Sequence, residues 1–186
     1  MTAAETRRAR ALGLQERILG LEPPLPDDAR QLFSEMRSVL RAASDEGLLA
    51  TGPAEIHALL KTVTERDGKV AITGGYKDFQ RTGQHPRFVR RDGAWFHFTL
   101  TVAPRSRRKL DLIAYDFELV FPDGTDPVFI RFDLNPPEHD NEEQGLRSHV
   151  HPGTDDFSAP APLMSPLEIL DVVLHDLCLR RKKPRA

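Results

Sequence analysis

Two histidines separated by a single residue, His149 and His151, are the side chains of this sequence best suited to chemistry. Residues 146–151 have the pattern of a short strand, and side chains two apart on a strand point the same way. The two imidazoles can therefore converge on one metal ion or one phosphate. Histidine titrates near neutral pH, so it can give or take a proton without a large change in its pKa.

Charged residues of the neighbouring segments belong to the same face. Residues 96–102, 112–121 and 128–134 alternate between apolar and polar side chains, which is typical of half-buried strands. This prediction assumes that no bulge inverts the alternation. With the apolar side chains turned toward helices, the other face collects His97, Thr99, Asp116, Glu118, Arg131, Asp133, Arg147, His149 and His151.

The first interpretation of this cluster is metal-free acid–base chemistry on RNA. The two histidines would transfer protons, and a neighbouring carboxylate would assist them. An arginine alongside would hold the phosphate with two parallel hydrogen bonds. The candidate catalytic residues are His149, His151, Glu118 and Asp133, and the candidate phosphate-binding residues are Arg131 and Arg147.

The second interpretation is a divalent-metal cofactor used for hydrolysis, because mixed histidine and carboxylate ligands are typical of such sites. Loops on either side of the histidine pair supply further ligands. In the third interpretation, the same side chains only brace a loop or form a protein interface. The candidate metal ligands are His149, His151, Asp155, Asp156 and His139.

The patterns along the chain predict an α+β fold, in which helices pack on one face of an antiparallel β-meander. Residues 1–68 are predicted to be a helical N-terminal region, with helices over residues 1–20, from residue 27 to 47 and from residue 53 to 67. Residues 69–186 are predicted to form the sheet and a closing C-terminal helix, within one compact domain. Residues 75–84 show no period, so no structure is predicted for them.

Composition excludes several classes of protein. The 186-residue chain has a formal net charge of -2, so it has no overall attraction to nucleic acid or to an anionic membrane. Its one cysteine, Cys178, excludes an intrachain disulfide and a Cys₄ or Cys₂His₂ zinc site. We find neither a secretory signal nor an apolar run of about 20 residues, so a cytoplasmic protein without a membrane partner is expected.

The order of motifs in residues 112–178 supplies one family resemblance. An antiparallel sheet is followed by Asp133 and Asn135, then by His149-Val150-His151, then by one helix over residues 165–177. In this order the segment resembles the small TumE-type toxins of prokaryotic toxin–antitoxin systems. It departs from them because Leu134 splits the Asp-Asn pair, the loop before His149 is long and the helical N-terminal third has no counterpart.

The resemblance implies a small intracellular effector that acts on RNA, either as a ribonuclease-like toxin or as a block to translation. Its implied partners are RNA and a cognate antitoxin or other protein, bound through the N-terminal helices. The competing class is a non-enzymatic module that binds a protein with the sheet face or the same helices.

Overall fold

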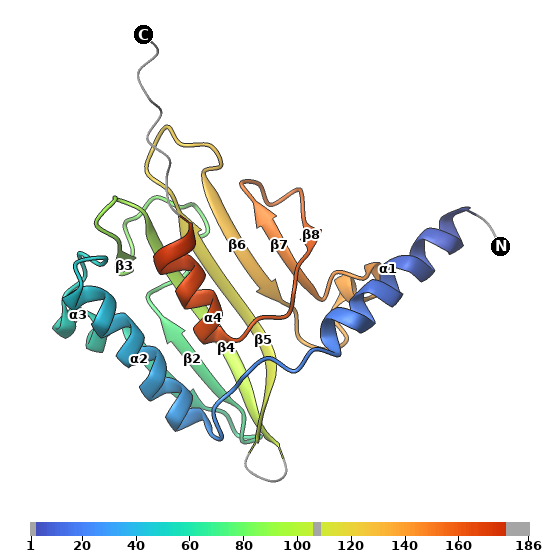
Figure 1. Ribbon diagram of the computed structural model, residues 1–186, viewed down its shortest axis with the longest axis horizontal. Coiled ribbons are helices and arrows are strands. Elements are labelled where there is room, and N and C mark those ends of the chain that lie inside the picture. Colours follow the sequence, from blue (N-terminus) through green and yellow to red (C-terminus); the bar gives the residue numbers. More distant parts are fainter. Residues whose placement is uncertain (1–2, 106–108, 178–186) are drawn as a thin grey trace.

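The computed structural model describes residues 3–105 and 109–177. One antiparallel sheet of eight strands forms its centre, and helices lie on one face of that sheet (Figure 1). The helices come mostly from the N-terminal third and the C-terminal end of the chain, so the predicted α+β class is confirmed.

The strands follow one another through the sheet in chain order, as in a meander, except that the short β3 pairs with β4 beside β2. Each neighbouring pair is antiparallel. The strands are β1 (Leu60–Thr64), β2 (Val70–Gly74), β3 (Phe88–Val89), β4 (Trp95–Arg105), β5 (Lys109–Val120), β6 (Phe129–Leu134), β7 (Ser148–Pro152) and β8 (Ala159–Pro160).

The helices begin at capping residues that the sequence contains. Asp28 precedes α2 (Ala29–Asp45), and its carboxylate accepts a hydrogen bond of 2.8 Å from the backbone N–H of Gln31. Ser165 and Glu168 form a capping box before α4 (Pro166–Asp171), which continues as the π-helical turn η2 (Val172–Asp176). The remaining helices are α1 (Ala3–Leu19), α3 (Pro53–Leu59) and the 3₁₀-helix η1 (Asp140–Gln144).

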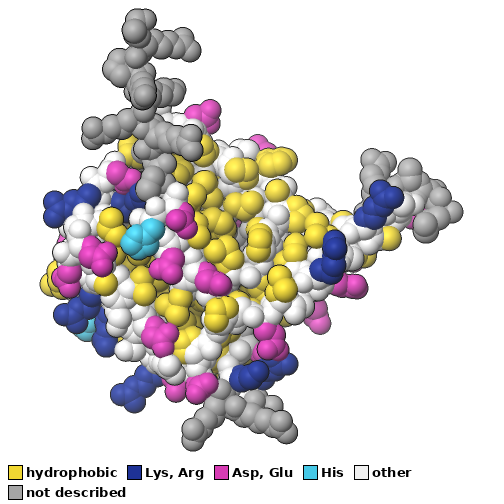
Figure 2. Space-filling view, in the orientation of Figure 1, with side chains coloured by type: hydrophobic (Ala, Val, Ile, Leu, Met, Phe, Trp, Pro, Cys, Tyr) yellow, Lys and Arg dark blue, Asp and Glu magenta, His cyan; other side chains and the backbone are white. Residues whose placement is uncertain are grey.

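The hydrophobic core lies between the sheet and helices α2 and α4. A run of stacked phenylalanine rings crosses it, with centroid distances of 5.0 Å between Phe88 and Phe96 and 4.8 Å between Phe98 and Phe117. The apolar stripe of α2 packs on the same cluster. Figure 2 shows hydrophobic side chains over the middle of this helix-covered face. The partly buried hydrophobic residues that pack against the core include Ile130, Phe132, Leu163, Met164 and Leu167.

Two local predictions are wrong. The helix that begins at Pro53 ends at Leu59, and Leu60–Thr64 instead pairs with β2 as an edge strand. The β-branched residues of Leu60–Thr64 favour a strand. Val63, which would be buried in a helical stripe, is instead 61% exposed. A bulge also shifts the β4–β5 register at Ile113, so Leu112 lies opposite Val102 and joins the core.

Helix α1 projects from the body of the molecule (Figure 1). It is held where Gln15 accepts a hydrogen bond of 2.6 Å from the Arg147 amide, close to η1 and the start of β7. Among the described helices, we find none with the length and hydrophobicity needed to cross a bilayer.

Replacement of Gly74 by alanine should reduce the free energy of unfolding by about 2 kcal/mol, the usual cost of overpacking a core. A Cβ atom at this position in β2 would overlap the rings of Phe98 and Phe88. Urea denaturation measures the change. Gly13→Ala in α1 is the control, because its Cβ would meet nothing within 4 Å; an equal loss in both variants would contradict the packing explanation.

Candidate functional site

Two rows of polar residues cross the sheet on the face opposite the helices. In the first row, His97 lies opposite Glu118, Glu118 opposite Arg131, and Arg131 opposite His151. In the second row, Thr99, Asp116, Asp133 and His149 lie opposite one another in the same order of strands. The polar face predicted from the alternation is therefore confirmed across these strands.

Two loops cover much of this face. Residues 75–87 connect β2 to β3 and bring Arg81 across the sheet, while residues 153–158 connect β7 to β8 and bring Asp155 to meet it. The side chains beneath are buried. His97, Glu118, Asp133, His149 and His151 expose between 2% and 8% of their surface.

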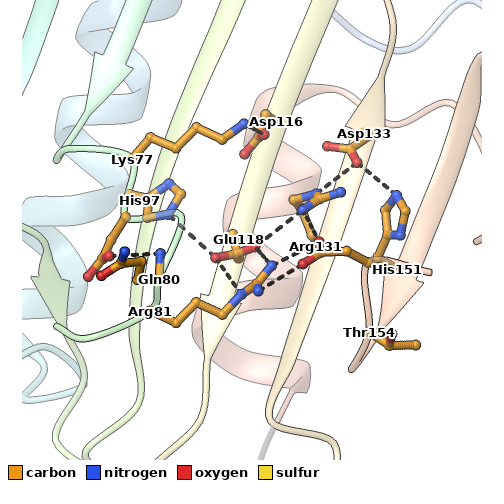
Figure 3. Close-up of polar contacts among 12 residues, drawn as sticks. Lys77, Gln80, Arg81, His97, Asp116, Glu118, Arg131, Asp133, His151 and Thr154 are labelled. Carbon is orange, nitrogen blue, oxygen red and sulfur yellow. Dashed lines mark hydrogen bonds and ion pairs between the residues drawn. The ribbon is translucent and has the colours of Figure 1, made fainter. Parts of the chain in front are cut away.

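Asp133, His149 and His151 bring three ligand atoms together. The Oδ2 atom of Asp133 lies 3.5 Å from Nε2 of His149 and 3.3 Å from Nε2 of His151. The two Nε2 atoms are 3.1 Å apart. Figure 3 shows His151 and Arg131 both pointing at the Asp133 carboxylate. Within the described part of the chain, this is the group of histidines and carboxylates with the geometry to hold a metal ion.

Neighbouring groups orient these ligand atoms. Nδ1–H of His151 donates a hydrogen bond of 2.9 Å to the Phe157 carbonyl oxygen, which leaves the Nε2 lone pair available. Burial and the nearby His151 lower the pKa of His149, so its imidazole stays neutral. Burial and the charge of Asp116 raise the pKa of Asp133, against the opposing effect of Arg131.

A clamp of two arginines, Arg81 and Arg131, lies beside this triangle (Figure 3). Arg81 donates to both oxygens of Glu118, at 3.1 and 2.8 Å, and to both oxygens of Asp155, at 2.9 and 3.0 Å. Arg131 donates to Asp133 at 2.8 Å and to Asp155 at 2.6 Å. The two guanidinium groups hold the pKa of Asp155 down at about 2.

Arg81 occupies an unusual backbone conformation, with φ +53° in the left-handed region. Its guanidinium carbon lies 3.6 Å from the centroid of the Phe129 ring. Left-handed backbone costs a non-glycine residue roughly 1–2 kcal/mol. The ion pairs with Glu118 and Asp155 and the contact with Phe129 offset that cost and keep the side chain in place.

Glu118 is ionised at the centre of the network. Burial raises its pKa, but the pairing with His97 and Arg81 outweighs burial, and the pKa lies below its usual range. Its Oε1 atom is 3.6 Å from Nε2 of His97. Glu118 thus neutralises cations of the network, which is a different role from the predicted assistance to the histidine pair.

A groove of about 500 Å³ leads along the uncovered part of the face to Asp133. The exposed Phe79 ring and Lys77 stand on one side of it, with Lys77 paired to Asp116. Its other lining residues include Thr99, Asn135 and Pro136. Of the three ligand residues, Asp133 lines this groove, and His149 and His151 lie behind it, buried.

Other predicted residues lie outside the triangle. Arg147 donates to the backbone carbonyls of Asn135 and Ile113, at 3.1 and 3.4 Å, because it precedes β7 and turns toward the α1 side. Asp155 belongs to the arginine clamp, and Asp156 is exposed in the same loop. His139 is exposed in the loop before η1.

Lys77 and Arg81 are the residues that sequence reasoning missed. Both lie in residues 75–84, where the apolar residues follow neither helical nor strand spacing, and no local signal shows that this loop crosses the sheet. His97 and Asp116 were placed on the correct face but were given no role.

Comparison of the chain with models of known protein families, with curated proteins and with solved structures finds no match.

Removal of the central carboxylate should destabilise the protein strongly. In Glu118→Ala, Arg81 and His97 would lose a buried partner, and we expect a loss of about 3–4 kcal/mol in the free energy of unfolding. Asp111→Ala removes a half-exposed carboxylate from the same strand, 3.5 Å from Arg105, and should cost less than about 1 kcal/mol. Chemical denaturation of both variants tests this; a similar small loss in each would mean that the network contributes little to stability.

The lowered pKa of His149 predicts how stability changes with pH when a chelator is present. Between the folded pKa and the ordinary value of 6.5, the unfolded chain binds a proton that the folded chain does not. The stabilising contribution is thus present above pH 6.5 and is lost as the pH falls below it. Denaturation from pH 7.5 to 5 should show this slope reduced in His149→Asn and unchanged in His57→Asn, an exposed histidine of α3.

Proposed function

We propose that this protein is a divalent-metal-dependent hydrolase, with Asp133, His149 and His151 as the metal ligands. The observation that carries this proposal is the triangle of Oδ2 and two Nε2 atoms, whose sides are 3.1, 3.3 and 3.5 Å. Tetrahedral zinc with bonds of about 2.0–2.1 Å places its ligand atoms roughly 3.3 Å apart. The three atoms therefore have the spacing of one face of such a coordination shell.

The three ligands leave room for hydrolytic chemistry. Asp133, His149 and His151 would hold a divalent metal with a further position open, and the bound metal would supply activation of water near neutral pH. A substrate would approach this position through the groove that Asp133 lines. Arg131 holds the Asp133 carboxylate in place, and the Phe157 carbonyl holds the His151 ring.

The same geometry disfavours the metal-free mechanism. A general acid and a general base that act on one phosphoryl group must stand on either side of it. The Nε2 atoms of His149 and His151 are 3.1 Å apart, which leaves no space for a phosphoryl group between them. The histidine pair is better suited to binding one ion.

RNA stays our proposed substrate, and a cognate antitoxin our proposed partner, on the strength of the order of motifs shared with TumE-type toxins. Phe79 supports an RNA substrate, since its ring beside the groove is 80% exposed and can stack on an unpaired base.

Purified protein should bind close to one equivalent of Zn²⁺, Mn²⁺ or Co²⁺, measured by elemental analysis after dialysis. Metal bound to the folded state alone stabilises it by about 2.7 kcal/mol at a hundredfold excess over Kd. For a chain of this size, that corresponds to a rise of roughly 5–10 °C in Tm, which a chelator should reverse.

The double variant His149→Ala/His151→Ala should lose both the metal and the Tm rise, while His139→Ala should keep both. Metal-free wild-type protein whose Tm does not respond to any of these ions would overturn the proposal. So would a metal content that survives the double substitution, because the ion would then lie elsewhere.

A further inference from the structure

We infer that Arg81 and Arg131 form a binding site for a phosphoryl group, and that Asp155 fills this site with its own carboxylate until a substrate displaces it. The inference deepens the proposed function, since it names phosphoric esters as the substrates of the metal site. The anion site itself rests on the arginine geometry, separately from any metal.

The carboxylate of Asp155 is bound as a phosphoryl group would be. Arg81 presents two parallel N–H groups to its two oxygens, at 2.9 and 3.0 Å, and Arg131 adds a third at 2.6 Å from the other side. This fork geometry fits carboxylate and phosphate oxygens alike. A phosphoryl group offers one more oxygen, so it can satisfy the same donors.

Both arginines have partners besides Asp155 that hold them in place. Glu118 and the Phe129 ring fix Arg81, and Asp133 fixes Arg131. Their side chains are only 20% and 17% exposed, whereas the Asp155 side chain is 54% exposed on a surface loop. The cationic side of the site is therefore rigid, and the anionic side is the part that can leave.

The charges of the site favour exchange once a divalent cation is present. The two arginines are balanced by Glu118 and Asp133, so Asp155 adds an excess negative charge. A divalent cation at the triangle would reverse this balance and leave the site attractive to a dianion. A phosphomonoester carries a second charge near neutral pH, which makes it a better occupant than a single carboxylate, whereas a phosphodiester carries one charge and would compete on equal terms.

The site lies beside the metal triangle. Nε of Arg131 donates to Oδ2 of Asp133, the oxygen that faces both imidazole nitrogens. The loop that carries Asp155 also carries Phe157, whose carbonyl binds His151. A phosphoryl group in place of Asp155 would therefore sit next to the metal position, as the hydrolysis of a phosphoric ester requires.

Isothermal titration of the full chain with inorganic phosphate, in the presence of a chelator, tests the anion site alone. Wild-type protein should bind phosphate weakly, because the tethered carboxylate competes at a high effective concentration. Asp155→Ala should bind it at least about tenfold more tightly, since the competitor is gone. Asp155→Asn, which keeps the size of the side chain, should behave in the same way if the alanine variant folds poorly.

Asp156→Ala is the matched control, because it removes the same charge from the next residue of the same loop. Its phosphate affinity should equal that of wild type. Adding Arg81→Met to Asp155→Ala should abolish the gain. The inference is overturned if Asp155→Ala gains no affinity, if Asp156→Ala gains as much, or if the gain survives loss of Arg81.

The metal-binding measurement distinguishes failure of this inference from failure of the proposed function. If phosphate binds Asp155→Ala under chelator but no metal binds the protein, the anion site stands and the hydrolase falls. A competition of adenosine monophosphate with a short RNA that lacks a terminal phosphate then identifies the phosphoryl source. Tighter monophosphate binding assigns a terminal phosphate, and tighter RNA binding assigns a phosphodiester.

Discussion

The rest of this structure depends on the pairing of buried charges on the face of the sheet opposite the helices. An ion removed from water costs several kcal/mol unless a partner of opposite charge compensates it. Glu118, which is 3% exposed, meets this demand with Arg81, and Asp133 meets it with Arg131. Because Arg81 comes from one covering loop and Asp155 from the other, the same ion pairs fix both loops over the sheet.

The metal triangle depends on that network for its orientation. Asp133 is held by Arg131 on one side and faces two imidazoles on the other, so its carboxylate cannot turn away without losing the 2.8 Å hydrogen bond from Nε of Arg131. The ring of His151 is fixed by a carbonyl of the loop that the arginines hold. Supporting bonds of this kind are what convert nearby ligand types into a preformed site.

Sequence reasoning succeeded where the physical cause is local. Alternation of period two follows from the pleat of a strand, so His97, Glu118, Arg131 and His151 were placed on one face before their register was known. It failed where a neighbour decides the outcome. Residues 60–64 carry an apolar pattern that suits a helix, but pairing with β2 makes them a strand. Arg147 stands two positions before His149, so the alternation places it on the same face. It lies outside β7, however, and donates hydrogen bonds to backbone carbonyls instead.

The sequence by itself determined the α+β class, the capped helices and the set of side chains that share the polar face, because each depends on residues close together in the chain. Only the tertiary structure decided which of them form a site. Arg81 meets Glu118 across 37 positions and Asp155 across 74. Pairing between charges so distant in the chain leaves no periodic trace, since it arises from strand order and from the cost of leaving a buried charge alone.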